Sequence, residues 1–273
     1  MKYLTTAEHR EVVRRLVTLA KSFQGCERPH DAGLEYTSLM LCFMMHGVES
    51  AESLLTLHDR YQDEWFPATT GYVVARSLFE VDVNAHYISG DPRVRSRRYI
   101  DFEHVIQKNT FEAIERHRAS ASSSWREGLQ LAYNLEYAPR KPQIDANYNR
   151  VRSQFENAKR KRATNWAGIS IREMATQVDH LEAYDIFYAD LSAFTHVNVM
   201  FANRFLRLNN GEAAWSMHAN EFDVANVFRY TATFLSCFLE LFGAQFKLWE
   251  KAKVMMCWDF PGSEEGGQTT SPP

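Results

Sequence analysis

Apolar residues recur at helical spacing along most of this chain. Between residues 7 and 23 their spacing matches one face of an α-helix, at Val12, Val13, Leu16, Val17, Leu19 and Ala20. Two other segments, 39–45 and 222–256, are apolar on most sides, which is typical of helices inside a bundle. The spacing therefore predicts an all-α fold, an antiparallel multi-helix bundle.

One short segment departs from this helical pattern. Asn209-Asn210-Gly211 separates two runs that contain apolar residues, and an Asn-Gly turn between such runs indicates a hairpin. We therefore expect one small β-hairpin near residues 204–217. The remaining helices are expected to form a single domain over residues 1–258, and the Gly-, Ser- and Pro-containing segment 259–273 is expected to be a disordered tail.

Charge and cysteine content exclude several classes of protein. The formal net charge of -3 and the pI near 6.4 provide no long-range positive field for nucleic acid. The four cysteines form no C-x-x-C pair, which argues against a zinc knuckle and favours a reducing, cytoplasmic compartment. Glu240 interrupts the apolar segment 230–249, so we expect a buried helix there and no membrane partner.

Two polar stripes are the best candidates for a functional site. Arg76 and Glu80 stand four residues apart in an otherwise apolar helix expected at about residues 68–88, so their side chains share one face. Tyr188, Ser192 and His196 follow one another at the same spacing in a helix expected at about residues 181–201. If the two faces meet, a guanidinium, a carboxylate, a hydroxyl and an imidazole converge in one cleft.

Such a cleft has two interpretations. In the first, His196 transfers a proton, Arg76 neutralises a developing negative charge and Glu80 orients either one. In the second, the same groups form a buried polar network that fixes the packing of the helices and binds no substrate. The sequence does not decide between an enzyme and a structural network.

Other spacings suggest further chemistry. Arg98 and His104 have the Arg-x5-His spacing used by helical ribonucleases that cleave RNA without a metal, although many such pairs arise by chance. Glu27-x-x-His30 has the spacing of a di-iron ligand pair, but Pro29 prevents a helix there, so neither a metal nor a cofactor is expected. The basic segment 150–162 is more typical of a solvated face than of an RNA-binding surface.

The chain also resembles a bacterial all-helical family known only as a domain of unknown function. The resemblance rests on the Arg76-x3-Glu80 motif, on a motif that contains Trp166, Ser170 and Arg172, and on Tyr188-x3-Ser192-x3-His196. It implies a shared polar site at these eight residues, with Trp166, Ser170 and Arg172 as ligand-binding residues. It also implies a cytoplasmic protein and, for some members, an association with phage defence.

These observations together predict a bacterial interaction or phage-defence protein with a central polar cleft. The cleft is either structural or binds a small anionic ligand, and a protein partner or a homo-oligomer is compatible with the pattern. The alternative is a metal-independent ribonuclease or phosphodiesterase that uses His196 or His104 with an arginine.

Overall fold

The computed structural model describes residues 4–23, 25, 30–118, 120, 122–157, 159, 161–188, 191–192, 206–209, 212–215 and 221–248. The chain divides into two compact units. Unit 1 comprises Met1–Asp31, Met40–Ala85 and Asp185–Pro273, and unit 2 comprises Ala32–Leu39 and His86–Tyr184. One boundary falls within α2 (Leu34–Trp65) and another within α3 (Ala68–Ser89), so each of these helices contributes to both units.

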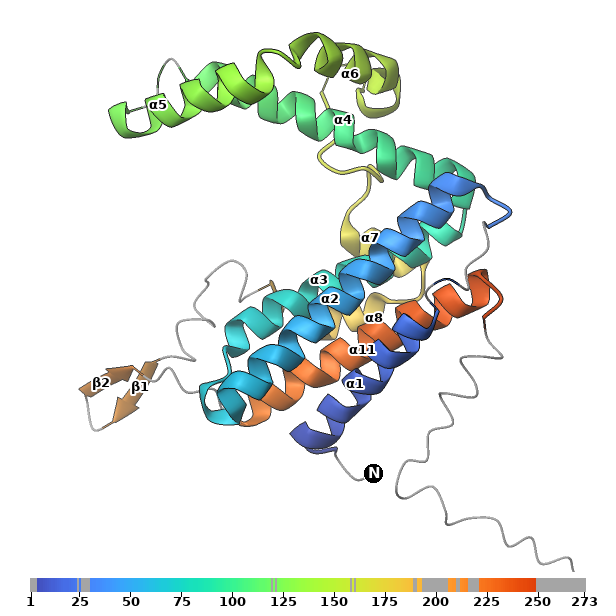
Figure 1. Ribbon diagram of the computed structural model, residues 1–273, viewed down its shortest axis with the longest axis vertical. Coiled ribbons are helices and arrows are strands. Elements are labelled where there is room, and N and C mark those ends of the chain that lie inside the picture. The colour runs from blue at the N-terminus through green and yellow to red at the C-terminus, as the bar shows by residue number, and fades with distance from the viewer. Residues whose placement is uncertain are drawn as a thin grey trace, which may run out of the picture. The chain divides into compact units, whose positions relative to one another are not determined.

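Unit 1 is a bundle formed by α1 (Thr6–Ser22), most of α2 and α3, and α11 (Glu221–Gln245) (Figure 1). Thr5 caps α1 and exchanges hydrogen bonds with Glu8, which forms a capping box. The helices pack closely, since a Cβ placed on Gly47 of α2 would lie 3.3 Å from Leu235 and 3.9 Å from Leu78. The all-α class expected from the apolar spacing is confirmed.

Aromatic side chains from α11 fill the core of unit 1. Phe234 packs edge-on against Phe79 of α3 with ring centroids 5.1 Å apart, and Phe242 stacks on Phe23 at 6.0 Å. Over its described part, residues 230–248, the apolar segment is therefore explained by burial of most of its large apolar side chains inside a bundle. Within the described ranges, the structure contains no helix with the length and apolarity needed to cross a bilayer.

Helix α11 ends earlier than the apolar pattern predicts. The pattern places its end near residue 256, whereas the helix ends at Gln245. Lys247 adopts a left-handed conformation with φ 58°, and the Leu248 N–H donates a 2.8 Å hydrogen bond to the Gly243 carbonyl. This arrangement is a Schellman motif, and it terminates the helix without the glycine that usually signals such an end.

Unit 2 contains α4 (Pro92–His117), α5 (Ser123–Ala132), η1 (Tyr133–Tyr137), α6 (Lys141–Phe155), α7 (Ile171–Gln177) and α8 (Leu181–Ala183). Helices α4 and α6 lie side by side around a core of Val105, Tyr148, Val151 and Phe155 (Figure 1). Both α4 and α6 have a proline in the first turn, a position where helices tolerate this residue.

Two described segments bear on the expected secondary structure: one matches the expected hairpin and the other departs from an expected α-helix. Strands β1 (Leu206–Asn209) and β2 (Glu212–Trp215) pair antiparallel, with Leu206 opposite Trp215, within the range where the Asn-Gly turn indicates a hairpin. The helix expected at residues 181–201 begins as α8 and continues as a π-helix, η2 (Tyr184–Tyr188). Residues 189–190, 193–205 and 259–273 lie outside the described residues, so the tail stays a prediction.

An ion-pair network stabilises unit 2 beside its core. The Arg162 guanidinium donates two hydrogen bonds, of 2.7 and 2.9 Å, to the two carboxylate oxygens of Glu112. These bonds lower the pKa of Glu112 from 4.5 to about 2, against the opposing effect of burial, and Lys108 adds to the lowering. The basic segment 150–162 therefore supplies at least one cation, Arg162, to an ion pair within unit 2.

Gly71 of α3 gives a first test of the packing in unit 1. An added Cβ would lie 2.7 and 2.9 Å from the γ-carbons of Val227 and 3.0 Å from Phe66. We expect Gly71→Ala to lower the free energy of unfolding by about 2 kcal/mol through overpacking, measured by urea denaturation.

Gly128→Ala in α5 is the matched control. A Cβ at Gly128 would have no neighbour within 4 Å, so alanine should stabilise the exposed helix by about 0.5 to 1 kcal/mol through its higher helix propensity. Equal effects of the two substitutions would show that Gly71 is not a close-packed position.

The lowered pKa of Glu112 gives a second test. Because the carboxyl is more acidic in the folded state, its contribution to stability is present above pH 4.5 and is lost as the pH falls toward about 2. We expect Glu112→Gln to lower the free energy of unfolding at pH 7 by about 1 kcal/mol, allowing for solvent screening. It should also weaken the loss of stability between pH 4.5 and 2, measured by urea denaturation across this range.

Glu115→Gln on the same helix is the control for this experiment. Glu115 lies 3.8 Å from Lys141 and is 40% exposed, so its pairing is weaker. Identical pH profiles for the two variants would contradict the assigned role of the Arg162–Glu112 pair.

Candidate functional site

Three of the residues that the sequence singles out meet in unit 1. The Arg76 Nε donates a 3.0 Å hydrogen bond to Oε1 of Glu80, and Tyr188 donates a 3.1 Å hydrogen bond to the same oxygen. The Arg76 Nη2 also donates to the Tyr188 hydroxyl at 2.8 Å. A single carboxylate oxygen therefore accepts hydrogen bonds from a guanidinium and a phenol. We call Arg76, Glu80 and Tyr188 the α3 triad.

Helix α3 and the π-helix η2 position the α3 triad. Arg76 and Glu80 are one helical turn apart on α3, which places them side by side. Tyr188 is the last residue of η2, and its ring packs against Phe79 with centroids 5.4 Å apart. The Arg76 guanidinium lies 4.9 Å from the centre of the same ring, so the tyrosine contributes both a hydroxyl and a cation–π contact.

The local environment fixes the charges of the α3 triad. Burial, followed by the charge of Glu80, raises the pKa of Tyr188, although Arg76 opposes the shift. Burial tends to lower the pKa of Arg76, but the interactions with Tyr188 and Glu80 outweigh it and raise the pKa. The tyrosine is therefore a neutral donor and the arginine a permanent cation at neutral pH.

The expected cleft also includes Ser192 and His196, whose contact with the α3 triad stays a prediction. Ser192 is half-buried and follows the fully buried Leu191. His196 lies outside the described residues, so its proposed proton transfer stays a prediction. The meeting of Arg76 with Tyr188 is the part of the expected convergence that the structure describes.

The three expected ligand-binding residues belong to unit 2. Trp166 is buried, packs edge-on against Tyr87 and Tyr99 at 5.6 and 5.2 Å, and accepts a 2.6 Å hydrogen bond at its carbonyl from Arg98. Ser170 caps α7 in a capping box with Glu173, as its spacing predicts. These contacts give Trp166 and Ser170 structural roles.

The remaining residues of these motifs lie elsewhere in unit 2. Arg172 is an exposed residue of α7. The guanidinium of Arg98 lies over the Phe155 ring at 4.8 Å in addition to its bond with the Trp166 carbonyl. The arginine beside His104 is Arg150, whose Nη2 lies 3.0 Å from His104 Nε2. Among the described residues, His104 therefore contacts Arg150, whereas Arg98 contacts the Trp166 carbonyl.

Much of the basic segment 150–162 takes part in ion pairs. Arg152 Nε donates a 2.6 Å hydrogen bond to Glu156, and Tyr148 donates a hydrogen bond to the same carboxylate. Arg150 lies 3.7 Å from the buried Asp101. These contacts support the interpretation of the segment as a structural and solvated face.

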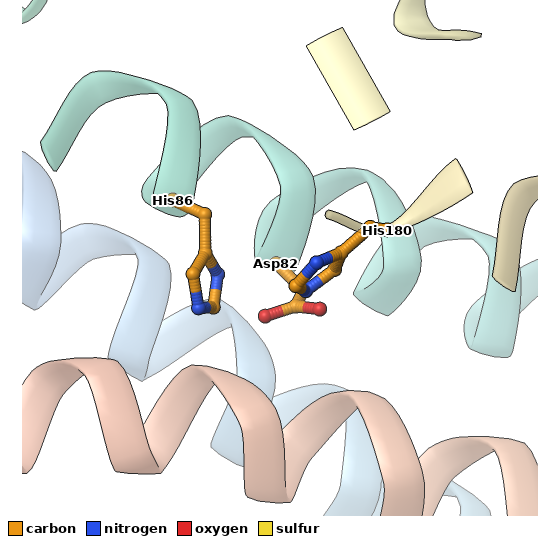
Figure 2. A group of neighbouring side chains, drawn as sticks. All are labelled: Asp82, His86 and His180. Carbon is orange, nitrogen blue, oxygen red and sulfur yellow. The ribbon is translucent and has the colours of Figure 1, made fainter. Parts of the chain in front are cut away.

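Sequence reasoning missed a group of possible metal ligands. Asp82, His86 and His180 each offer one ligand atom, and these atoms all lie within 4.8 Å of one another. Figure 2 shows the three side chains turned toward one another, with Asp82 and His86 on the same helix. The i,i+4 spacing of Asp82 and His86 was available in the sequence, but no pattern linked them to His180.

Comparison with known proteins places the chain in a family. A model of the family of unknown function DUF5677 matches residues 37–213, which is more than half of the chain and includes all eight residues of the expected site. No match was found among curated proteins or among solved structures. The chain therefore belongs to the DUF5677 family, a family of unknown function.

Proposed function

We propose that this protein binds a small anionic molecule at the α3 triad. The supporting observation is that Arg76 and Tyr188 both donate to one oxygen of Glu80, at 3.0 and 3.1 Å. Two convergent donors, one of them charged, form the arrangement that recognises a carboxylate or phosphate oxygen. In this proposal Glu80 occupies the position that an oxygen of the ligand takes in the complex.

The exposure of Glu80 supports exchange with a ligand. Its side chain is 40% exposed, whereas that of Arg76 is 17% exposed. The carboxylate can therefore rotate into water while the guanidinium stays in place. On ligand binding, Tyr188 would donate its hydrogen bond to the ligand oxygen instead of to Glu80, and the raised pKa of Tyr188 keeps the hydroxyl protonated.

A second set of the same residue types supplies a comparison within the chain. Arg152 and Tyr148 both donate to Glu156, again with the arginine four residues before the glutamate. The Glu156 side chain is only 11% exposed, so its carboxylate is less accessible to a ligand than that of Glu80. We assign this second set a structural role, and the greater exposure of Glu80 distinguishes the α3 triad from it.

The biological setting that we propose follows from the family resemblance. A bacterial cytoplasmic protein that acts in phage defence or through a protein partner could use a small anion as a signal or a substrate. A loss of protection against phage in cells that carry Arg76→Lys, with unchanged protein level, would support this setting.

Anion binding predicts opposite effects for the members of the α3 triad. Removing the competing charge with Glu80→Gln should tighten binding of inorganic pyrophosphate about tenfold. Tyr188→Phe should weaken binding because it removes a donor, and Arg76→Lys should weaken it because lysine lacks the planar donor geometry of the guanidinium. Isothermal titration calorimetry with phosphate, pyrophosphate and AMP measures these changes.

Glu156→Gln is the matched control and should leave anion binding unchanged. The proposal is wrong if none of the three probes binds the wild-type protein, or if Glu80→Gln weakens binding as Arg76→Lys does. A lower melting temperature in all three α3-triad variants, together with no anion binding by the wild-type protein, would identify a structural network instead.

A metal-independent ribonuclease is the second candidate function. The observation that favours it is the 3.0 Å approach of Arg150 Nη2 to His104 Nε2, which brings a cation and an acid–base group together. His196 stays the alternative histidine, although it lies outside the described residues.

The ribonuclease proposal predicts cleavage of end-labelled tRNA by the purified protein in EDTA. His104→Ala and Arg150→Ala should abolish cleavage, and His46→Ala should not. If only His196→Ala abolishes cleavage, the reaction uses the alternative histidine. No cleavage by the wild-type protein would rule this function out.

A further inference from the structure

We infer that His86 and His180, with Asp82, form a binding site for a divalent transition-metal ion, with zinc as the best-fitting ion. The three ligand atoms lie within 4.8 Å of one another, a spacing that a single ion can bridge with small side-chain adjustments. The sequence analysis expects no metal, and no spacing in the sequence links His180 to Asp82 and His86. This site is separate from the α3 triad and goes beyond the proposed anion binding.

Helix α3 fixes the first two ligands. Asp82 precedes His86 by four residues on a helix that runs without interruption from Ala68 to Ser89. Side chains at this spacing lie on the same face of an α-helix, one turn apart. The relative placement of the carboxylate and the imidazole is therefore set by the helix itself.

A helix end fixes the third ligand. His180 follows α7, and its N–H donates a 2.8 Å hydrogen bond to the Ala175 carbonyl. Asp179, directly before it, has a left-handed conformation with φ 59°, which is typical of this kind of helix end. His180 is thereby held in unit 2 with its ring centroid 4.7 Å from that of His86, which also belongs to unit 2.

A hydrogen bond to the backbone prepares His180 as a ligand. Its Nδ1 lies 2.7 Å from the Val178 carbonyl oxygen, and because a carbonyl only accepts, Nδ1 must carry the proton. The neutral ring then has its lone pair on Nε2. A histidine that ligates a metal through one ring nitrogen commonly donates the other N–H to a backbone carbonyl, which fixes both tautomer and orientation.

The ligand types indicate the class of ion. Two imidazole nitrogens and one carboxylate oxygen suit zinc and other first-row divalent ions, and they are a poor set for calcium or magnesium. Asp82 is 0% exposed, and a carboxylate oxygen is a common third ligand beside two histidines in zinc sites. Three protein ligands leave a coordination position for water, as in zinc sites that perform chemistry.

Titration of untagged, metal-free protein with Zn²⁺ and Co²⁺ tests the site. We expect one tightly bound ion per chain, a rise in melting temperature that depends on zinc concentration, and cobalt absorption bands typical of nitrogen and oxygen ligands. His86→Gln and His180→Gln should each weaken zinc binding about 100-fold or more. Asp82→Asn, which preserves the shape of the side chain, should also weaken it.

His46→Gln is the control, since His46 bonds to Ser77 and is outside the group. Circular dichroism confirms that each variant is folded, and if His180→Gln unfolds, His86→Gln decides the question. Absence of stoichiometric binding to the wild-type protein would overturn the proposal, as would unchanged affinity in the histidine variants. A sulfur-to-cobalt charge-transfer band would place the ion on cysteine and would overturn it as well.

Discussion

The close packing of α3 against α11 is the constraint on which the arrangement of unit 1 depends. At Gly71 the absence of a side chain lets Val227 approach the α3 backbone, and about two turns later Phe79 packs edge-on against Phe234. Two such contacts along one helix prevent its rotation about its own axis, because rotation would expose Phe79 and create a clash at Gly71. This fixed orientation determines where Arg76 and Glu80 lie.

Exposure, more than residue type, separates a structural network from a candidate binding site in this chain. The sets around Glu80 and Glu156 use the same three side-chain types with similar hydrogen bonds. Glu156 is only 11% exposed, and moving its carboxylate would leave the buried Tyr148 hydroxyl without this acceptor. Glu80 borders solvent, so water can replace the protein donors when it moves. The greater exposure of its carboxylate is therefore the feature that makes Glu80, rather than Glu156, the candidate for displacement by a ligand.

The sequence was sufficient for features set by local spacing. Apolar periodicity identified the helices of unit 1, and the spacing of Arg76 and Glu80 placed both side chains on one helical face. Features that rest on unusual backbone conformations were missed, because non-glycine residues adopt them. Lys247 ends α11 and Asp179 directs His180, both in left-handed conformations that give no clear signal in the sequence.

The same reason explains the part of the candidate site that could not be predicted. The π-helix η2 that ends at Tyr188 replaces the α-helical spacing assumed for that segment. The approach of His180 to His86 depends on how α7 ends rather than on any spacing between the two histidines. A pairing that arises from tertiary structure alone leaves no periodic pattern to detect.

Helical geometry also separates the two proposed sites on α3. Successive residues turn by about 100°, so Arg76 and Glu80 share one face, and Asp82 and His86 share another that is about 120° around the helix. An anion at the first face and a cation at the second would therefore share no ligand group. Helix α3 carries residues of both sites, so a small shift of this helix is the direct route by which occupancy of one site would influence the other. Measured coupling between pyrophosphate and zinc would report that motion, whereas independent binding would show that α3 acts as a rigid support.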